Sequence, residues 1–320
     1  MRNSPAVSSQ SETAAAGQQV ESLAADLFII QNPAAGLGNG ERVRRRIVAE
    51  LSARQVPHRL SYTREPGHAE DLAREALAQG CRRIAVAGGD GTVLEVVSAV
   101  VGTDAQIALL PVGTGNQLAA NLGIPRRLGR AVEVAVRGVT RKIDVGMLNG
   151  RPFTIMAGAG LDAEVVRAEP RLKRRVGYLA YVYAAARAIL KPRTAMLRVT
   201  IDGQVITARG MGVEVANMPG LTAPIFRRPI RIMPDLAADD GRLGVCVLGT
   251  ETAFDFLSAL TAIFIGRHRQ HRKLQYFTGR EVTVEADPPL PAQVDGELRG
   301  TTPFRATVRP RALNVIVPAG

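Results

Sequence analysis

The sequence contains no tryptophan, and aromatic residues make up only 4% of its 320 residues. A protein that stacks the bases of single-stranded nucleic acid needs aromatic side chains, so this composition disfavours that class. There are two cysteines, Cys81 and Cys246, which are too few for a disulfide framework or a cysteine-based zinc site. Both lie in apolar surroundings and are expected to be buried in a reducing cytosol. The four histidines are scattered, without the H-E-x-x-H spacing of zinc proteases.

Long hydrophobic runs are also missing. The longest apolar stretches, residues 178–190 and 254–266, fall short of the roughly 20 residues that cross a bilayer. The N-terminus lacks the apolar core of a signal peptide, and residues 1–26 are rich in Ser, Gln and Ala. We therefore expect a cytoplasmic protein with a disordered lead-in over residues 1–26.

Negative charge is the scarcer sign, with 29 acidic residues against 41 Lys and Arg and a formal net charge of +12. This excess favours anionic partners, such as nucleotides, nucleic acid or an anionic membrane surface. No nucleic-acid recognition motif accompanies the charge, so nucleic acid is not an expected partner. Two basic stretches, residues 171–175 and 267–273, adjoin apolar helical patterns. Such stretches are solvated faces by default, or sites that dock on an anionic membrane.

The first ordered part alternates short apolar strands with helical patterns. Strands are predicted at residues 27–30, 58–62, 83–87 and 107–110, and helices at residues 41–53 and 68–79 and after residues 92 and 116. This alternation predicts a Rossmann-like α/β domain with a parallel sheet over residues 27–145. The loops that begin at Asn32, Thr63, Gly88 and Pro111 then share the carboxyl edge of the sheet, where ligands bind in such folds.

Beyond residue 145 the pattern becomes rich in strands. They are predicted at residues 153–157, 195–201, 204–208, 212–217, 230–233, 242–248, 281–285, 293–294, 304–308 and 312–317. Asp202-Gly203 is a hairpin signal, and helices are expected only at residues 172–190 and 253–265. Residues 146–320 are therefore predicted to form a β-sandwich domain whose last strand could return to the first domain.

The segment Gly88-Gly89-Asp90-Gly91-Thr92 follows a predicted strand and opens a helix. Free N–H groups and the helix dipole at such a turn favour phosphate. The Asp90 carboxylate would repel a bare phosphate, and it suits a site in which a divalent cation lies between them. No Lys stands where a Walker A loop has one, so this is a different kind of phosphate site. Asp90 could also simply cap the helix, and Glu95 on its first turn suits the helix dipole.

Similar chemistry recurs in other loops. Residues 32–40 contain glycines whose spacing does not fit a dinucleotide fingerprint, which leaves a tight turn or a nucleotide phosphate contact. In residues 111–116 two glycines permit close approach of a ligand, while Thr114 and Asn116 offer polar side chains. Two acidic turns, residues 237–241 and 294–297, have hairpin composition, and the first could hold a cation through its Asp-Gly pair.

Five motifs follow one another along the chain. They are Asn32-Pro33-x-x-Gly36, Gly88–Thr92, Gly113-Thr114-Gly115-Asn116, Asp240-Gly241 and Asp295-Gly296-Glu297. Together they resemble the diacylglycerol kinase catalytic-domain family of lipid kinases, which includes bacterial diacylglycerol kinases and the sphingosine and ceramide kinases. The resemblance extends over nearly all of the chain after residue 26. It implies an ATP- and Mg²⁺-dependent kinase that works peripherally on a lipid substrate at an anionic membrane surface, with its active site in a cleft between an α/β domain and a β-sandwich domain.

The resemblance also implies roles for single residues. The nucleotide would be held by residues of the glycine-rich and neighbouring loops: Asn32, Pro33, Ala34, Ala35, Gly36, Thr63, Gly88, Gly89, Asp90, Gly91, Thr92, Glu95, Gly113, Thr114 and Asn116. The carboxylate of Asp295 or of Glu297 would act as general base, with Asp90 in the magnesium network. Asp240 would bind a structural Mg²⁺ together with main-chain oxygens of Ala237 and Arg242.

Three positions depart from the family pattern: Ala35 in place of Ser, Leu94 in place of Asn and Gln117 in place of Asp. Residues 115–119 look more like the sphingosine and ceramide kinase branch, so the acceptor stays open between diacylglycerol, a sphingoid base or ceramide, and a related lipid. An NAD kinase-like enzyme shares the diglycine-aspartate loop, and a nucleotide- or lipid-binding sensor with the same fold would keep it too. An exposed strand edge in either domain could pair two copies into a homodimer.

Overall fold

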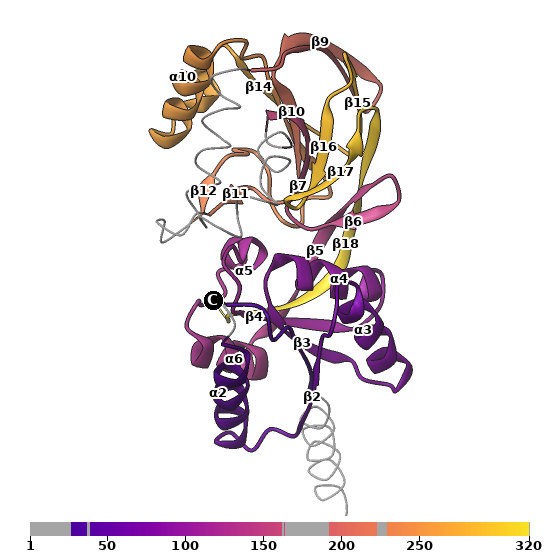
Figure 1. Ribbon diagram of the computed structural model, residues 1–320, viewed down its shortest axis with the longest axis vertical. Coiled ribbons are helices and arrows are strands. Elements are labelled where there is room, and N and C mark those ends of the chain that lie inside the picture. Colours follow the sequence, from indigo (N-terminus) through magenta and orange to yellow (C-terminus); the bar gives the residue numbers. More distant parts are fainter. Residues whose placement is uncertain (1–26, 37–38, 162, 164–191, 223–228, 320) are drawn as a thin grey trace, which may run out of the picture.

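The computed structural model describes residues 27–36, 39–161, 163, 192–222 and 229–319. The expected lead-in over residues 1–26, the basic stretch at 171–175 and the helix at 172–190 lie outside the described residues. Figure 1 shows a lower part in which helices surround a sheet, and an upper part made mainly of strands.

The lower part contains the parallel sheet that the sequence predicts. Its strand order is β2-β1-β3-β4. The strands are β1 (Leu27–Gln31), β2 (His58–Tyr62), β3 (Arg83–Gly88) and β4 (Gln106–Pro111). The helices are α2 (Gly40–Ser52), α3 (His68–Ala78), α4 (Asp90–Val100), α5 (Gln117–Asn121) and α6 (Leu128–Arg137). Because helices cover the sheet, its central strands are buried on both faces and read as continuous apolar runs.

One long strand joins the two parts of the molecule. Strand β18 (Phe304–Val317) pairs parallel with β4 and antiparallel with β5 (Val139–Leu148) and β15 (Glu281–Asp287). The sheet continues through β8 (Ala195–Ile201) to β9 (Gln204–Gly210), with β6 (Arg151–Phe153) beside β5, and reaches ten strands. Figure 1 shows β18 in yellow passing from the upper part into the lower one.

The prediction of separate strands at 304–308 and 312–317 is therefore wrong. A single strand runs through both, with a shift in register between Arg309 and Leu313. Pro310 has no N–H to donate and Arg311 adopts a positive φ of 49°, so the pairing is irregular there although the strand continues. Strand β5 was not predicted, and the expected domain boundary at residue 145 lies inside it.

A second sheet completes a β-sandwich, as predicted. Its six strands run in the order β14-β13-β10-β7-β16-β17. They are β7 (Met156–Gly160), β10 (Gly212–Ala216), β13 (Leu243–Leu248), β14 (Leu274–Gly279), β16 (Pro291–Val294) and β17 (Glu297–Thr301). Buried residues of the two sheets share one core, in which Val213 and Val245 of the second sheet cluster with Val199 and Val282 of the first.

Three smaller elements complete the described fold. Helix α10 (Ala253–Phe264) and the 3-10 helix η1 (His268–Gln270) follow β13, and the short strand β11 (Gly220–Leu221) pairs with β12 (Ile230–Arg231). The strand predicted at 230–233 is thus only two residues long. Among the described residues, no helix has both the length and the apolar character to cross a membrane.

Candidate functional site

Three of the predicted loops meet at the carboxyl edge of the parallel sheet. The N–H of Asn32, just after β1, donates to the carbonyl of Ala87 at 2.9 Å. The N–H groups of Val112 and Gly113, just after β4, both donate to the carbonyl of Gly88, at 3.3 and 3.2 Å. The loops after β1, β3 and β4 are therefore fixed to one another through their backbones.

The side chain of Asn32 adds a second tie between two of these loops. Its Oδ1 accepts from the N–H of Ala34 at 2.9 Å, which closes the turn after β1. Its Nδ2 donates to the hydroxyl of Thr92 at 3.0 Å, on the first turn of α4. Asn32 thus positions the turn formed by Pro33, Ala34 and its neighbours beside the N-terminus of α4.

The glycines of this edge let backbones approach closely. A Cβ atom on Gly113 would lie 2.5 Å from the Cα of Gly89, and one on Gly88 would lie 2.6 Å from the Cβ of Thr92. Gly36 has a φ of +69°, and its Cβ would lie 2.6 Å from the carbonyl of Val112. Only residues without a Cβ fit these positions, which leaves backbone rather than side chains to face a ligand.

Asp90 begins α4 and turns its carboxylate toward α5. The N–H of Leu118 donates to it at 3.4 Å, and the N–H groups of Gln117 and Asn116 also stabilise it. Burial raises the pKa of Asp90, these N–H groups lower it in part, and the negative charge of Asp295 raises it further. The two carboxylates are therefore near enough to act on each other, although 205 residue numbers separate positions 90 and 295.

Asp295 lies in the turn between β16 and β17, in a left-handed conformation with a φ of 47°. Its Oδ2 accepts from the N–H and the hydroxyl of Thr154, at 2.7 and 2.9 Å. Its Oδ1 accepts from the N–H groups of Ile155 and Met156, both at 2.9 Å. Four donors thus fill the roughly four lone-pair positions of a carboxylate. Burial raises the pKa of Asp295 despite these hydrogen bonds, which act to lower it.

These bonds explain why the strand predicted at residues 153–157 is interrupted. Strand β6 ends at Phe153 and β7 begins at Met156. In between, the N–H groups of Thr154 and Ile155 point to Asp295 instead of a neighbouring strand. A long-range hydrogen-bond acceptor therefore overrides the local preference for an extended strand.

Glu297 and Glu95 lie in different surroundings from this pair. Glu297 is exposed on β17 and forms an ion pair with Arg299 at 2.7 Å. Glu95 accepts at 3.0 Å from the N–H of Ala69 and so stabilises the first turn of α3. The sequence suggested a nucleotide contact for Glu95; the structure gives it a partner in the neighbouring helix.

The two other predicted polar contacts border the same edge. Thr63 follows β2 and its N–H donates to the carbonyl of Gln31 at 2.9 Å. Thr114 is exposed, whereas Asn116 exchanges two hydrogen bonds with the backbone of Gly113, at 3.1 and 2.6 Å, and has a φ of 52°. Asn116 therefore shapes the turn.

Asp240 closes its own turn. Its carboxylate accepts from the N–H groups of Ala237 and Arg242, at 2.9 and 3.0 Å. The predicted ligands at those two positions are main-chain oxygens, whereas these hydrogen bonds come from the N–H groups of the same two residues. Within the described ranges no group of three or more His, Cys, Asp or Glu side chains has a metal-holding arrangement. The structural Mg²⁺ at Asp240 stays a prediction.

Sequence reasoning missed Asp144 on β5, which is 1% exposed. It accepts from the N–H groups of Gly241 and Arg311, at 2.6 and 2.7 Å, and so fastens the Asp240 turn to β18. Burial raises the pKa of Asp144, and the charges of Asp240 and Asp239 raise it further. A single acidic residue inside the apolar run 143–148 was the signal that could have identified it.

Buried Asn217 connects this turn with the Asp295 loop. Its Nδ2 donates to the carbonyls of Asp144 and Thr154, both at 3.0 Å. A continuous set of contacts therefore runs from the Asp240 turn through Asp144, Asn217 and Thr154 to Asp295. Because each of these hydrogen bonds has a backbone group as one partner, neither Thr154 nor Asn217 had a recognisable motif.

Gln117, which stands where the family pattern has Asp, holds α5 to a distant segment of the chain. Its amide exchanges two hydrogen bonds with the backbone of Thr222, at 2.8 and 2.7 Å. One helical turn later, the amide of Asn121 does the same with Gly220, at 2.8 and 3.0 Å. Helix α5 is thereby attached to the segment around β11.

Comparisons with known proteins agree with this architecture. Residues 26–148 match the family described as diacylglycerol kinase catalytic domain, and residues 155–317 match the YegS C-terminal NAD kinase beta sandwich-like domain. The chain is 29% identical over 258 residues to the diacylglycerol kinase of Bacillus subtilis, covering 79% of this chain and 83% of that protein. It is 27% identical over 278 residues to the diacylglycerol kinase of Staphylococcus carnosus, covering 86% and 89%. A crystal structure of a Bacillus anthracis protein proposed to be a diacylglycerol kinase has a TM-score of 0.77 and 25% identity, covering 92% of this chain and 95% of that one.

Proposed function

Because this chain belongs to the diacylglycerol kinase catalytic-domain family, whose enzymes phosphorylate a hydroxyl group of a lipid, we propose that it transfers the γ-phosphate of ATP to a membrane lipid in a Mg²⁺-dependent reaction. The observation that carries the proposal is the glycine-lined edge of the sheet at the start of α4, where N–H groups of α5 stabilise the Asp90 carboxylate and the negative charge of Asp295 also acts on it. Phosphoryl transfer requires positioning and charge neutralisation, and this edge has groups for both.

The phosphate groups of ATP would lie against the loops after β1, β3 and β4. Close backbone approach at Gly89 and Gly113 and the N-terminus of α4 suit an anionic ligand. The carboxylate of Asp90 fits a Mg²⁺ ion, because Mg²⁺ is commonly bound by one or two carboxylates together with substrate phosphates. When bound, the ion would neutralise phosphate charge, and it would offset the cost of burying the Asp90 carboxylate.

In the proposed reaction a lipid hydroxyl oxygen forms a bond to the γ-phosphorus, and the bond from that phosphorus to the β–γ bridging oxygen breaks. ADP leaves, and the hydroxyl proton passes to the carboxylate of Asp295 or of Glu297. Asp295 is partly buried and its negative charge acts on Asp90, but its acceptor positions are filled. Of its four donors only the Thr154 hydroxyl can rotate away, so a lipid hydroxyl would take the place of that group.

The substrate proposal combines two sources. The relatives in Bacillus and Staphylococcus are named diacylglycerol kinases, which favours diacylglycerol as the acceptor. Residues 115–119 look more like the sphingosine and ceramide kinase branch, so sphingoid bases and ceramide belong in any test. The presence of Gln at position 117 does not argue for a non-catalytic sensor, because its hydrogen bonds to Thr222 explain why Gln stands there.

A kinase assay with labelled ATP and Mg²⁺ tests the proposal. The acceptors would be diacylglycerol, a sphingoid base, ceramide and a bacterial lipid extract, with NAD as a further acceptor because the second domain resembles that of NAD kinase. We expect labelled lipid, and none with Asp90→Asn. Label in NAD alone would support the NAD kinase-like alternative, and no label in any acceptor above the Asp90→Asn background would refute the kinase proposal.

A further inference from the structure

We propose that the exposed face of α10, together with the basic segment after it, is a surface by which this protein docks on an anionic bilayer. The inference rests on the proposed function, because a kinase for a membrane lipid must reach its acceptor at the bilayer. It assigns that contact to particular residues, far along the chain from the glycine-rich loops.

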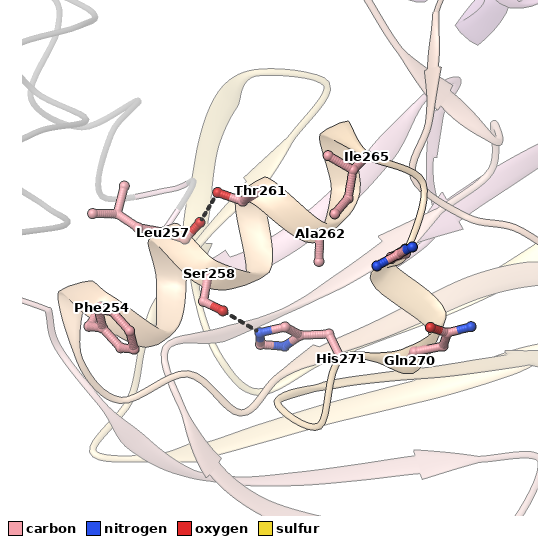
Figure 2. Close-up of a pocket in the computed structure, with 9 residues that line it drawn as sticks. Phe254, Leu257, Ser258, Thr261, Ala262, Ile265, Gln270 and His271 are labelled. Atoms are coloured by element: carbon pink, nitrogen blue, oxygen red, sulfur yellow. Dashed lines mark hydrogen bonds between the residues drawn. The ribbon is translucent and has the colours of Figure 1, made fainter.

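Helix α10 has large apolar side chains where a globular protein would have polar ones. Phe254 and Leu257 on the helix, and Ile265 just after it, are 80%, 51% and 61% exposed. Phe254, Leu257 and Thr261 are spaced at i, i+3 and i+7, so they share one face of the helix. A hollow of about 580 Å³ lies along this surface, lined by these residues and by His271 among others. Figure 2 shows Phe254 and Leu257 near one end of the helix and Ile265 near the other.

The opposite side of α10 holds it firmly on the protein. Ala259 is buried and belongs to a small core with Met233 and Leu274. At the start of the helix, Thr252 and Asp255 form a reciprocal capping box. The exposed apolar face therefore belongs to a helix that is capped and packed on the protein, and fraying of the helix end does not account for the exposure.

Positive charge gathers next to this face. Arg267, Arg269, Arg272 and Lys273 follow α10 within one short segment. Arg269 pairs with Asp235 and Lys273 with Glu251, whereas Arg267 and Arg272 form no ion pair within the described part of the chain. Apolar side chains followed by arginines that have no ion pair among the described residues match the two layers of an anionic bilayer, the acyl boundary and the charged headgroups.

The size of α10 fits a position in the plane of the interface. A helix of 12 residues is about 18 Å long, well short of the roughly 30 Å hydrocarbon core. An apolar face of this kind with basic residues at its end is typical of helices that lie at the headgroup boundary. A second copy of the chain would instead bring two sets of arginines together, which is unfavourable.

Vesicle binding by the full chain tests the assignment. Sedimentation would compare vesicles of phosphatidylcholine with vesicles that also contain phosphatidylglycerol. We expect Phe254→Ser with Leu257→Ser to weaken binding to the anionic vesicles on the order of tenfold or more. The matched control is Met196→Ser with Val205→Ser, on strands β8 and β9 of the ten-stranded sheet, where these side chains are 51% and 50% exposed. This control variant should bind the vesicles as the unmodified chain does.

A second pair of variants tests the contribution of the arginine charges to vesicle binding. Arg267→Gln with Arg272→Gln should weaken binding to the anionic vesicles on the order of tenfold and leave phosphatidylcholine binding unchanged. Arg42→Gln with Arg46→Gln on exposed positions of α2 is the matched control. Equal losses in both pairs would mean that net charge alone acts, and would refute a local surface.

The lack of tryptophan permits a direct probe of insertion. Phe254→Trp should shift its fluorescence to shorter wavelength when anionic vesicles are added, while Val205→Trp should not. No shift at position 254, or a change in oligomeric mass with Phe254→Ser and Leu257→Ser but no change in vesicle binding, would refute the proposal.

The catalytic variant Asp295→Asn should bind vesicles like the unmodified chain. Failure of the kinase reaction and failure of the docking surface are therefore measured separately.

Discussion

Alanine in place of Gly113 should force the two glycine loops apart. Its Cβ atom would lie 2.5 Å from the Cα of Gly89 and 3.1 Å from the Oδ1 of Asn116, whereas ordinary contact begins at 3.4 Å. One loop must therefore move by roughly 1 Å, and the contacted atom of Gly89 is backbone, which cannot rotate away. We expect the free energy of unfolding to fall by about 1–3 kcal/mol, the usual cost of forcing extra volume into a packed site.

Two other glycines of the same edge provide matched controls for the same chemical change. At Gly91 no atom lies within 4 Å of the added Cβ, and at Gly89 the nearest lies at 3.6 Å. Gly91 is in the first turn of α4 and its φ is not positive. Gly91→Ala should therefore raise the free energy of unfolding by about 0.5–1 kcal/mol, through helix propensity and a less flexible unfolded chain. Gly89→Ala should have a small effect.

Urea unfolding of the three variants measures the stability differences, and thermal unfolding with and without Mg²⁺ and ATP measures binding. A ligand at 100 times its Kd stabilises a protein by about 2.7 kcal/mol, and we expect Gly113→Ala to lose most of that gain because its loops no longer fit the phosphates. The reasoning would be refuted if Gly113→Ala unfolds at the same urea concentration as the unmodified chain. It would also be refuted if Gly91→Ala loses as much stability as Gly113→Ala, because the loss would then not come from the close approach of the loops.

Three further predictions concern single polar residues. Asn121→Ala should lower the free energy of unfolding by about 2 kcal/mol in urea denaturation, because two hydrogen bonds to the segment around β11 are lost; a change below about 0.5 kcal/mol would contradict it. Burial raises the folded-state pKa of Asp90, so ionisation costs stability as pH rises through that value, and Asp90→Asn should have the higher Tm at neutral pH. That difference in Tm should shrink toward pH about 4, near the pKa of the unfolded group, and a difference that grows there would be evidence against the burial effect. Glu297→Gln should change stability by less than about 0.5 kcal/mol because Glu297 is exposed; loss of lipid phosphorylation in this variant would make Glu297 the base, and retention would assign the proton to Asp295.

The α/β part of the fold could be predicted from the sequence because its strands are buried on both faces. Such strands appear as short continuous apolar runs, as in residues 84–87, and the helices between them have the expected period. The loops at the carboxyl edge follow from that alternation. The predicted meeting of the Asn32, Gly88 and Pro111 loops is a direct consequence of parallel strand order.

The strands that join the two parts could not be predicted in the same way. Strand β5 carries Arg141, Lys142 and Asp144 within ten residues, so its composition is not that of a buried strand. It is stabilised by pairing with β18, which is more than 150 positions away in the sequence. Pairing partners at that separation leave no periodic pattern in either segment.

Local patterns thus identified the glycine-rich turns, the positions of most strands along the chain and the residues that could carry charge in a phosphate site, because backbone conformation and burial act on neighbouring residues. The surroundings of those residues depended on contacts between distant segments. Asp295 interrupts a strand 140 positions earlier to obtain its donors, and its charge reaches Asp90 only because β18 and β7 bring the two parts of the molecule together. The hydrogen bonds that a carboxylate accepts and the charges that act on it come from residues close to it in space. The tertiary fold alone specifies which residues those are.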